Sequence, residues 1–259
     1  MNAFLSSLLL TSALVGGLHA SASTCSTDST ETRTERPTES KGNWSGLSFS
    51  ALSMAQFQGN LEDFNATWGA RGDLGLITDD AFESFRLSVN PFEKRQKLLG
   101  EFIGITTGIG FDWIRLGIAA DHVLAYDETN ETVVATVLDP NTMDVTINRV
   151  NAVYLRVPLL ASVHLFRTGG NGLHAEGGLV AGYLLHGKYN REFQVGATET
   201  VTEEDFPITP LQLSARIGLG FGKVSLLGEA ALLPFFDENP ADLPSMHSFT
   251  VGIQVALAD

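Results

Sequence analysis

Alternation of apolar residues with small or polar residues recurs along this chain from Trp44 onward. In residues 211–221 every second position, from Leu211 to Phe221, is apolar, and Gln, Ser, Arg and Gly fill the positions between them. Residues 249–257 follow the same pattern. Successive side chains of a β-strand point to opposite faces, so a period of two predicts strands with one apolar and one polar or small face. The pattern favours an all-β fold.

Eight segments carry this alternation, and their connections alternate in length. We predict strands at 44–54, 83–92, 99–117, 153–165, 173–187, 211–221, 224–235 and 249–257. The predicted connections are long at 55–82, 120–146 and 188–207, tight at 93–98, 167–172 and 222–223, and intermediate at 236–246. Long loops at one end and short turns at the other are typical of an antiparallel up-and-down barrel of the outer membrane. Residues 66–80 could form part of an additional hairpin, which leaves a count of ten strands as the alternative.

The scarcity of charge indicates which face of these strands looks outward. Segments 211–221, 224–234 and 247–257 contain Arg216 and Glu229 as their two formal charges. A polar face with so few charged residues is unusual for a surface in water, but it suits the wall of a narrow lumen that is filled by small side chains. An open sheet edge in hydrocarbon would leave backbone groups unpaired, so the sheet must close. We therefore predict an eight-stranded transmembrane β-barrel with its apolar face toward lipid; a soluble barrel with its apolar face inward is the alternative.

The N-terminal region has the pattern of an exported protein. Residues 4–18 form an apolar run of 15 residues, and the small residues Ala20 and Ala22 follow it. This arrangement is typical of a signal peptide, and the run is shorter than the roughly 20 apolar residues that a transmembrane helix needs. Residues 23–43 contain no Leu, Ile, Val, Phe or Met, which predicts a disordered linker rich in Ser, Thr and Glu. We expect a signal peptide at 1–22, a linker at 23–43 and the barrel at 44–259, with lipid attachment at Cys25 as an open alternative.

The composition excludes several classes of function. The net charge of −14 and the sequence pI near 4.7 argue against a nucleic-acid-binding protein, which needs a basic surface. The single cysteine allows neither an intramolecular disulfide nor a thiolate metal cluster. Most acidic residues lie in the linker and the long connections, where they are expected to form a solvated surface.

Two charged residues of the predicted lumen are expected to pair. If Gly222 and Lys223 form a two-residue hairpin loop, Arg216 lies directly opposite Glu229 on the neighbouring strand. An unpaired charge in a narrow lumen is costly, and an Arg–carboxylate pair offsets that cost. We interpret the pair as a structural filling of the lumen, with a charged gate as the alternative. Arg156 and Glu176 are expected to join the same lumen ion-pair network.

Other candidates for chemistry are weaker. His164 and His174 flank the connection 167–172 and share the inward face, but a metal site needs three or four ligands and no third is evident nearby. The isolated Ser, His and Asp residues show no nucleophile arrangement. We therefore predict no catalytic, cofactor-binding or metal-binding residues and no enzyme activity. Trp44, Trp113, Tyr154 and Tyr183 are candidates for aromatic anchors at the membrane interface, with their general preference for strands as the alternative explanation.

An ordered set of short motifs accompanies these strands. The motifs are Trp44-Ser45-Gly46 and the segments 85–92, 108–113, 154–160, 177–183, 216–220, 233–236 and 248–253. Together they resemble the PorT-like outer-membrane β-barrel family of Gram-negative bacteria. The resemblance implies an eight-stranded barrel in the cell outer membrane without catalytic residues, which contacts outer-membrane lipid and the barrel-assembly machinery. Members often end on an aromatic residue that this machinery reads, whereas this chain ends Leu257-Ala258-Asp259.

These observations favour a non-enzymatic integral outer-membrane protein whose lumen is filled by side chains. Its expected role is that of a scaffold, a loop-mediated binder or an accessory of secretion, since some similar proteins are linked to protein secretion. A secreted or periplasmic soluble β-barrel that binds an apolar ligand is the main alternative, and a narrow diffusion channel is a second. The sequence does not identify a specific protein partner.

Overall fold

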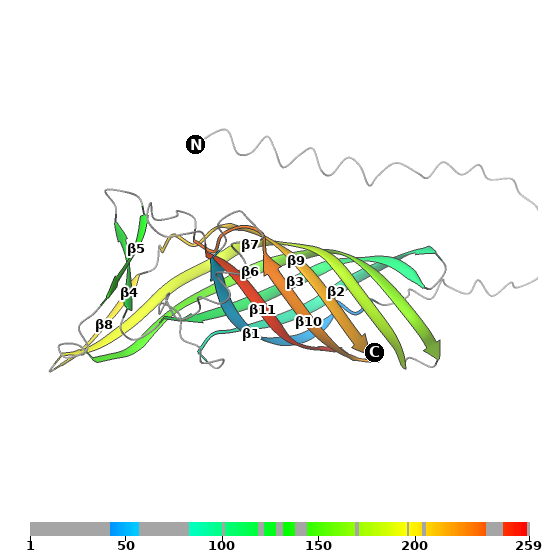
Figure 1. The fold of residues 1–259 in the computed structure, drawn as a ribbon, viewed down its shortest axis with the longest axis horizontal. Helices are drawn as coiled ribbons and strands as arrows, with labels where there is room; N and C mark the ends of the chain where they lie inside the picture. The colour runs from blue at the N-terminus through cyan, green and yellow to red at the C-terminus, as the bar shows by residue number, and fades with distance from the viewer. Residues whose placement is uncertain are drawn as a thin grey trace, which may run out of the picture. The chain divides into compact units, whose positions relative to one another are not determined.

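The alternating segments form antiparallel strands in a computed structural model of the chain (Figure 1). It describes residues 42–56, 83–99, 102–118, 122–127, 132–137, 144–168, 171–195, 197–203, 206–236 and 246–257. The predicted signal peptide, Cys25 and most of the predicted linker lie outside the described residues. No helix with the length and apolarity needed to cross a membrane occurs within these ranges.

Eight strands close into a ring. They are β1 (Gly46–Gln56), β2 (Phe85–Leu99), β3 (Ile103–Gly117), β6 (Asp144–Thr168), β7 (Asn171–Val195), β9 (Leu211–Phe221), β10 (Val224–Ala231) and β11 (Met246–Ala256). Each pairs with its neighbours in chain order, and β1 pairs with β11 to complete the circuit. All of these pairings are antiparallel. The prediction of an all-β chain with eight antiparallel strands is confirmed for the described residues.

Three shorter strands, which the sequence did not predict, lie outside the ring. The strand β8 (Ala197–Glu203) pairs with the far end of β7, beyond the residues that β9 covers. The strands β4 (His122–Asp127) and β5 (Thr132–Val137) form a separate two-stranded sheet. All three belong to connections that were predicted to be long.

The connections sort by length between the two ends of the ring. The turns after β2, β6 and β9 are short and share the end where β1 begins and β11 finishes, which we call the short-turn end. The connections after β1, β3, β7 and β10 are longer and share the opposite, long-connection end. Within the turn 222–223, Gly222 has a φ of 60°, a left-handed value that favours glycine. Phe221 therefore pairs with Val224 and Arg216 with Glu229, in the predicted register.

Several strand predictions were wrong in detail, since β6 begins before residue 153 and β7 runs past residue 187, both into segments predicted to be connections. The strand β2 runs on to Leu99 through residues 93–98, which were predicted to be a turn. The polar residues 93–97 still pair with β3, because ladder hydrogen bonds need only the backbone. Val153 and Tyr154 of β6 pair with His186 and Leu184 of β7. Leu185 is therefore an extra residue that bulges from β7. The bulge reverses the alternation, so His186, which the alternation of 173–187 would place on the inward face with Glu176, is exposed.

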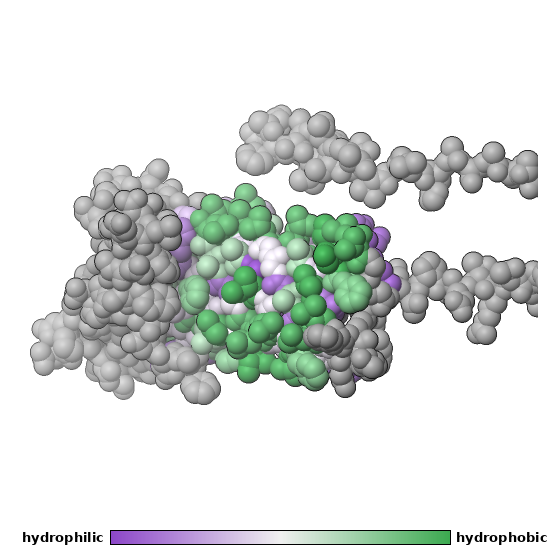
Figure 2. Space-filling model, turned by 45° about the vertical axis from the view of Figure 1, so that its right-hand side comes forward, coloured by the Kyte–Doolittle hydropathy of each residue, from purple (hydrophilic) through white to green (hydrophobic). Residues whose placement is uncertain are grey.

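The two faces of the ring differ sharply in polarity. Ile217 is 69% exposed and Ile253 55%, whereas Gln212 is 5% exposed and Gln254 only 1%. Large exposed apolar side chains occur on all eight ring strands, and Figure 2 shows them gathered over much of one face. The buried inward side chains include Ser, Thr, Asn, Gln, Arg, Asp and Glu. The apolar face of the strands therefore points out of the ring.

Toward the long-connection end the inward face becomes apolar. A buried cluster there joins ring strands to their connections, and it contains Ile114, Leu116, Val150, Tyr154, Tyr189, Phe206, Phe235 and Met246 among others. The hydroxyl of Tyr189 lies 3.2 Å from the Leu124 backbone nitrogen, which donates to it from β4. This cluster closes the long-connection side of the lumen with packed side chains.

Candidate functional site: a lumen ion-pair network

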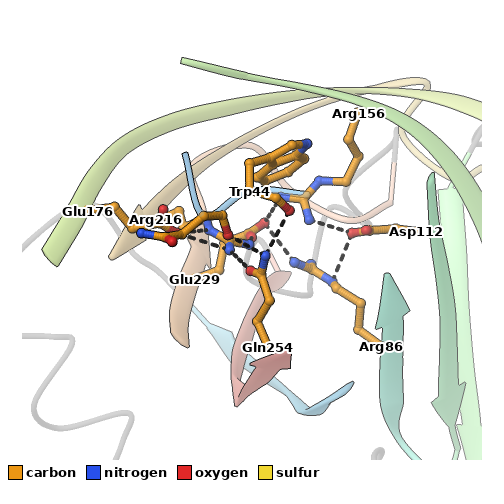
Figure 3. A network of polar contacts seen from close by, with 9 residues as sticks. Trp44, Arg86, Asp112, Arg156, Glu176, Arg216, Glu229 and Gln254 are labelled. Carbon is orange, nitrogen blue, oxygen red and sulfur yellow. Dashed lines mark hydrogen bonds and ion pairs between the residues drawn. The ribbon is translucent and has the colours of Figure 1, made fainter. Parts of the chain in front are cut away.

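Six buried charged side chains meet inside the ring, each from a different strand (Figure 3). They are Arg86 on β2, Asp112 on β3, Arg156 on β6, Glu176 on β7, Arg216 on β9 and Glu229 on β10. Strand alternation places each of them on the inward face. Three guanidinium groups meet three carboxylates, so the lumen ion-pair network is balanced in charge.

Four of these residues form a closed cycle. Oε1 of Glu229 accepts hydrogen bonds from Nη1 of Arg86 at 2.7 Å and from Nη2 of Arg156 at 2.6 Å. Oδ2 of Asp112 accepts one from Nη1 of Arg156 at 2.7 Å and lies 3.4 Å from Nε of Arg86. Each arginine thus contacts both carboxylates, which cross-links β2, β3, β6 and β10. Charge-assisted bonds of this kind are the strong ones in a protein interior.

Arg216 extends the network to β7 and β11. Its Nε and Nη2 donate to Oε1 of Glu176 at 3.2 and 3.1 Å, and Nη2 also donates to the side-chain oxygen of Gln254. Nη1 lies 4.0 Å from Oε2 of Glu229. Arg216 and Glu229 are therefore cross-strand partners, but the closer carboxylate to Arg216 is that of Glu176.

The structure brings together all four residues that the sequence singled out: Arg156, Glu176, Arg216 and Glu229. Arg86 and Asp112 also belong to the network, although neither was predicted from the sequence to join it. Both lie on the small or polar face of their strands. The strand alternation alone could therefore have predicted that their side chains point into the lumen. Asp112 contacts arginines of its two neighbouring strands, whereas Arg86 also reaches Glu229 on β10 across the lumen, and a contact between strands that are not adjacent could not be read from the sequence.

Trp44 occupies the lumen beside this network (Figure 3). Its side chain is fully buried, and the guanidinium carbons of Arg216 and Arg156 lie 4.9 and 5.7 Å from the ring centroid. Cations are attracted to the face of an indole at such distances. The indole also packs against Leu160 and Val180. The prediction of an interfacial anchor at Trp44 is wrong, because the residue precedes β1 and folds inward instead of outward.

The backbone before β1 is held by polar side chains of the lumen. Oε2 of Glu93 accepts hydrogen bonds from the backbone nitrogens of Trp44 and Ser45, both at 2.8 Å. Nε2 of Gln254 donates to the carbonyls of Asn43 and Trp44 at 2.6 and 2.7 Å. Residues 42–45 therefore form a segment that enters the lumen at the short-turn end.

Glycines on β3 make room for this segment. A Cβ atom on Gly108 would lie 2.8 Å from Cδ1 of Trp44, and one on Gly110 would lie 3.1 Å from Cζ2. Both distances are shorter than ordinary carbon contacts. The small residues of the predicted inward face thus accommodate a large aromatic side chain from another part of the chain.

The remaining aromatic anchors divide between the two faces. Trp113 and Tyr183 are exposed on the outer face, as predicted. Tyr154 is buried, and its hydroxyl donates to the carbonyl of Thr209 at 3.0 Å, so the interfacial prediction is wrong there. Its even position on β6 places it on the inward face with Arg156.

The two predicted inward histidines are neighbours at the short-turn end. His164 and His174 stack with ring centroids 5.8 Å apart. Nε2 of His174 lies 2.8 Å from the Ser225 hydroxyl, and Nε2 of His164 lies 3.1 Å from the amide nitrogen of Asn43. Among the described residues, no three His, Cys, Asp or Glu side chains gather in a way that could hold a metal ion.

Comparison of the chain with protein-family models, with curated proteins and with solved structures finds no match. The resemblance to PorT-like proteins therefore depends on the sequence motifs alone.

Proposed function

We propose that this chain is a non-enzymatic integral protein of the outer membrane, similar to PorT-like proteins, whose ring spans the bilayer as an eight-stranded β-barrel. The observation that carries the proposal is the belt of large apolar side chains exposed on every strand of the ring. Soluble monomers rarely expose a continuous apolar surface beyond a few hundred Å². If the ring is inserted in a bilayer, the acyl chains of the lipids cover this belt.

The height of the belt supports this proposal. On β3 the outward apolar positions run from Ile103 to Trp113. Ten residue steps span about 33 Å along a strand at about 3.3 Å each. A strand tilt of about 45° reduces this to roughly 23 Å, close to the apolar band of about 25 Å in outer-membrane barrels.

The contents of the lumen favour a scaffold over a channel or a ligand carrier. Trp44 and the lumen ion-pair network occupy the middle of the ring, and an apolar cluster packs its long-connection side. A soluble barrel that binds an apolar ligand would need an apolar interior, whereas charged groups lie at the centre here. The proposed role is therefore to hold the long connections at one membrane face, for binding or as an accessory of secretion.

Cell fractionation tests the location directly. The tagged chain, expressed in a Gram-negative host, is expected to sediment with outer membranes and to require detergent for extraction. Its folded form should migrate differently from the boiled form on a gel, because closed barrels resist unfolding by detergent. Recovery of folded protein in the periplasm or medium without detergent would instead identify the soluble alternative.

A charge placed on the apolar belt should reveal contact with lipid. Ile217→Arg is expected to lower the free energy of unfolding in lipid vesicles by about 2–4 kcal/mol, because the side chain would lie at mid-membrane depth. Leu233→Arg is the matched control, since Leu233 is exposed but follows the end of β10. It should cost about 0–1 kcal/mol, as near a membrane interface. Urea titration in vesicles measures both, and equal small losses would contradict insertion.

A further inference from the structure

Three basic residues lie together on the outer face of the ring near the long-connection end. Arg115 on β3 pairs with Asn151 on β6, and Asn151 pairs with Lys188 on β7. Arg149 lies two residues from Asn151 on the same strand and therefore on the same face. We call Arg115, Arg149 and Lys188, which surround Asn151, the basic patch.

The basic patch borders the apolar belt. Ile114 and Leu116 are fully buried, whereas Trp113 is exposed, so Arg115 shares the outward face with Trp113. The Arg115 guanidinium carbon lies 5.1 Å from the ring centroid of Phe85 and 5.9 Å from that of Trp113. Its charged group thus lies over the last aromatic rings of the belt, at the depth where lipid headgroups would begin.

Among the side chains that the structure describes, the charges of the basic patch have no acidic partner. Arg115, Arg149 and Lys188 form no ion pair there, although Glu192 lies opposite Ile147, two residues along β6 from Arg149. Nε of Arg115, Nε of Arg149 and Oδ1 of Asn151 are buried atoms without a hydrogen-bond partner there. Neighbouring like charges on a sheet repel one another. In a chain with a net charge of −14, such a grouping points to an external anion.

We propose that the basic patch binds the phosphate of an anionic lipid headgroup in the leaflet at the long-connection end. This inference rests on the proposed function, because only a ring inserted in a bilayer holds its outer face against headgroups. Guanidinium groups present a planar set of donors that matches phosphate oxygens, and an ammonium adds a compact charge. Basic residues at a membrane surface attract anionic lipids by about 1 kcal/mol each.

Quenching of Trp113 fluorescence by brominated lipids tests the proposal. The chain has three tryptophans, and Trp68→Phe leaves Trp44, enclosed in the lumen, and Trp113, on the belt. This variant is reconstituted in phosphatidylcholine vesicles that contain either dibrominated phosphatidylglycerol or dibrominated phosphatidylcholine. The anionic lipid should quench Trp113 several-fold more effectively at equal mole fraction, and added salt should reduce the difference.

Paired substitutions separate the basic patch from a general charge effect. Arg115→Gln with Lys188→Gln should abolish most of the several-fold preference for phosphatidylglycerol, because two of the three charges of the basic patch are removed. Lys94→Gln with Lys223→Gln removes the same charge from exposed side chains nearer the short-turn end and should leave the preference intact. Quenching by brominated phosphatidylcholine should persist in every variant, which reports that the ring is inserted.

The outcomes distinguish this inference from the proposed function. Equal quenching by both lipids, or a preference that survives Arg115→Gln with Lys188→Gln, would overturn the headgroup site and leave the membrane barrel standing. A Trp113 that neither lipid quenches would overturn the insertion itself, and the headgroup site with it.

Discussion

Replacing Glu229 with leucine should destabilise the folded ring by about 3–5 kcal/mol, the cost expected when one member of a buried ion pair is removed. The Glu229 carboxylate is within ion-pair distance of Arg86, Arg156 and Arg216. Its loss leaves three guanidinium groups with only Asp112 and Glu176 to balance them. Urea unfolding in detergent micelles or lipid vesicles measures the change.

Glu83→Leu is the control for this prediction. Glu83 is exposed just before β2, so its carboxylate is solvated and its replacement should change stability by no more than about 0.5 kcal/mol. A Glu229→Leu ring as stable as the Glu83→Leu ring would mean that the network contributes nothing to the fold.

Double-mutant cycles resolve the network further. Adding Arg156→Leu to Glu229→Leu should recover part of the loss, because Nη2 of Arg156 lies 2.6 Å from the Glu229 carboxylate. The sequence alone predicts a strong coupling between Arg216 and Glu229. Their separation of 4.0 Å instead favours a larger coupling of Arg216 with Glu176, at 3.1 Å. Strict additivity of Arg156→Leu and Glu229→Leu would contradict the cycle of bonds.

The faces of most ring strands and the register of one hairpin were predictable, because strand alternation has a fixed period. The pattern of residues 211–221 and the tight turn 222–223 together determine that Arg216 lies opposite Glu229. Departures from the period could not be predicted. The bulge beside Leu184 in β7 reverses the faces beyond it and buries Tyr189, and the alternation of residues 173–187 does not mark its position. Its cause is the pairing with β6, which is a tertiary contact.

The candidate site was predictable only in part, for a related reason. Strand alternation identifies which charged side chains point into the lumen. It does not identify which of them contact one another, since that depends on how far each side chain reaches across the ring. Arg86 illustrates this limit, because it contacts Asp112 on the neighbouring strand β3 and also Glu229 on β10, which does not flank β2. Trp44 illustrates another. The strand predicted from residue 44 begins only at Gly46, so Trp44 lies outside it, and its inward position follows from contacts with β2, β6, β9 and β11.

The position of Trp44 leads to the second large effect that we expect. Trp44→Ala should lower the free energy of unfolding by about 3–5 kcal/mol, the cost typical of truncating a fully buried aromatic side chain. The cavity would persist, because the rigid β3 backbone at Gly108 and Gly110 has no side chains to fill it. The guanidinium groups of Arg156 and Arg216 would also lose the aromatic face beside them. Urea unfolding in vesicles again provides the measurement.

Trp113→Ala is the matched control, because it removes the same side chain from the outer face. Trp113 is exposed on the apolar belt, where acyl chains of the proposed bilayer would fill the space that the indole leaves. Its replacement should therefore cost clearly less than that of Trp44. If Trp44→Ala costs no more than Trp113→Ala, the segment 42–45 does not contribute to closing the lumen, and the ring is stable without an aromatic side chain at its centre.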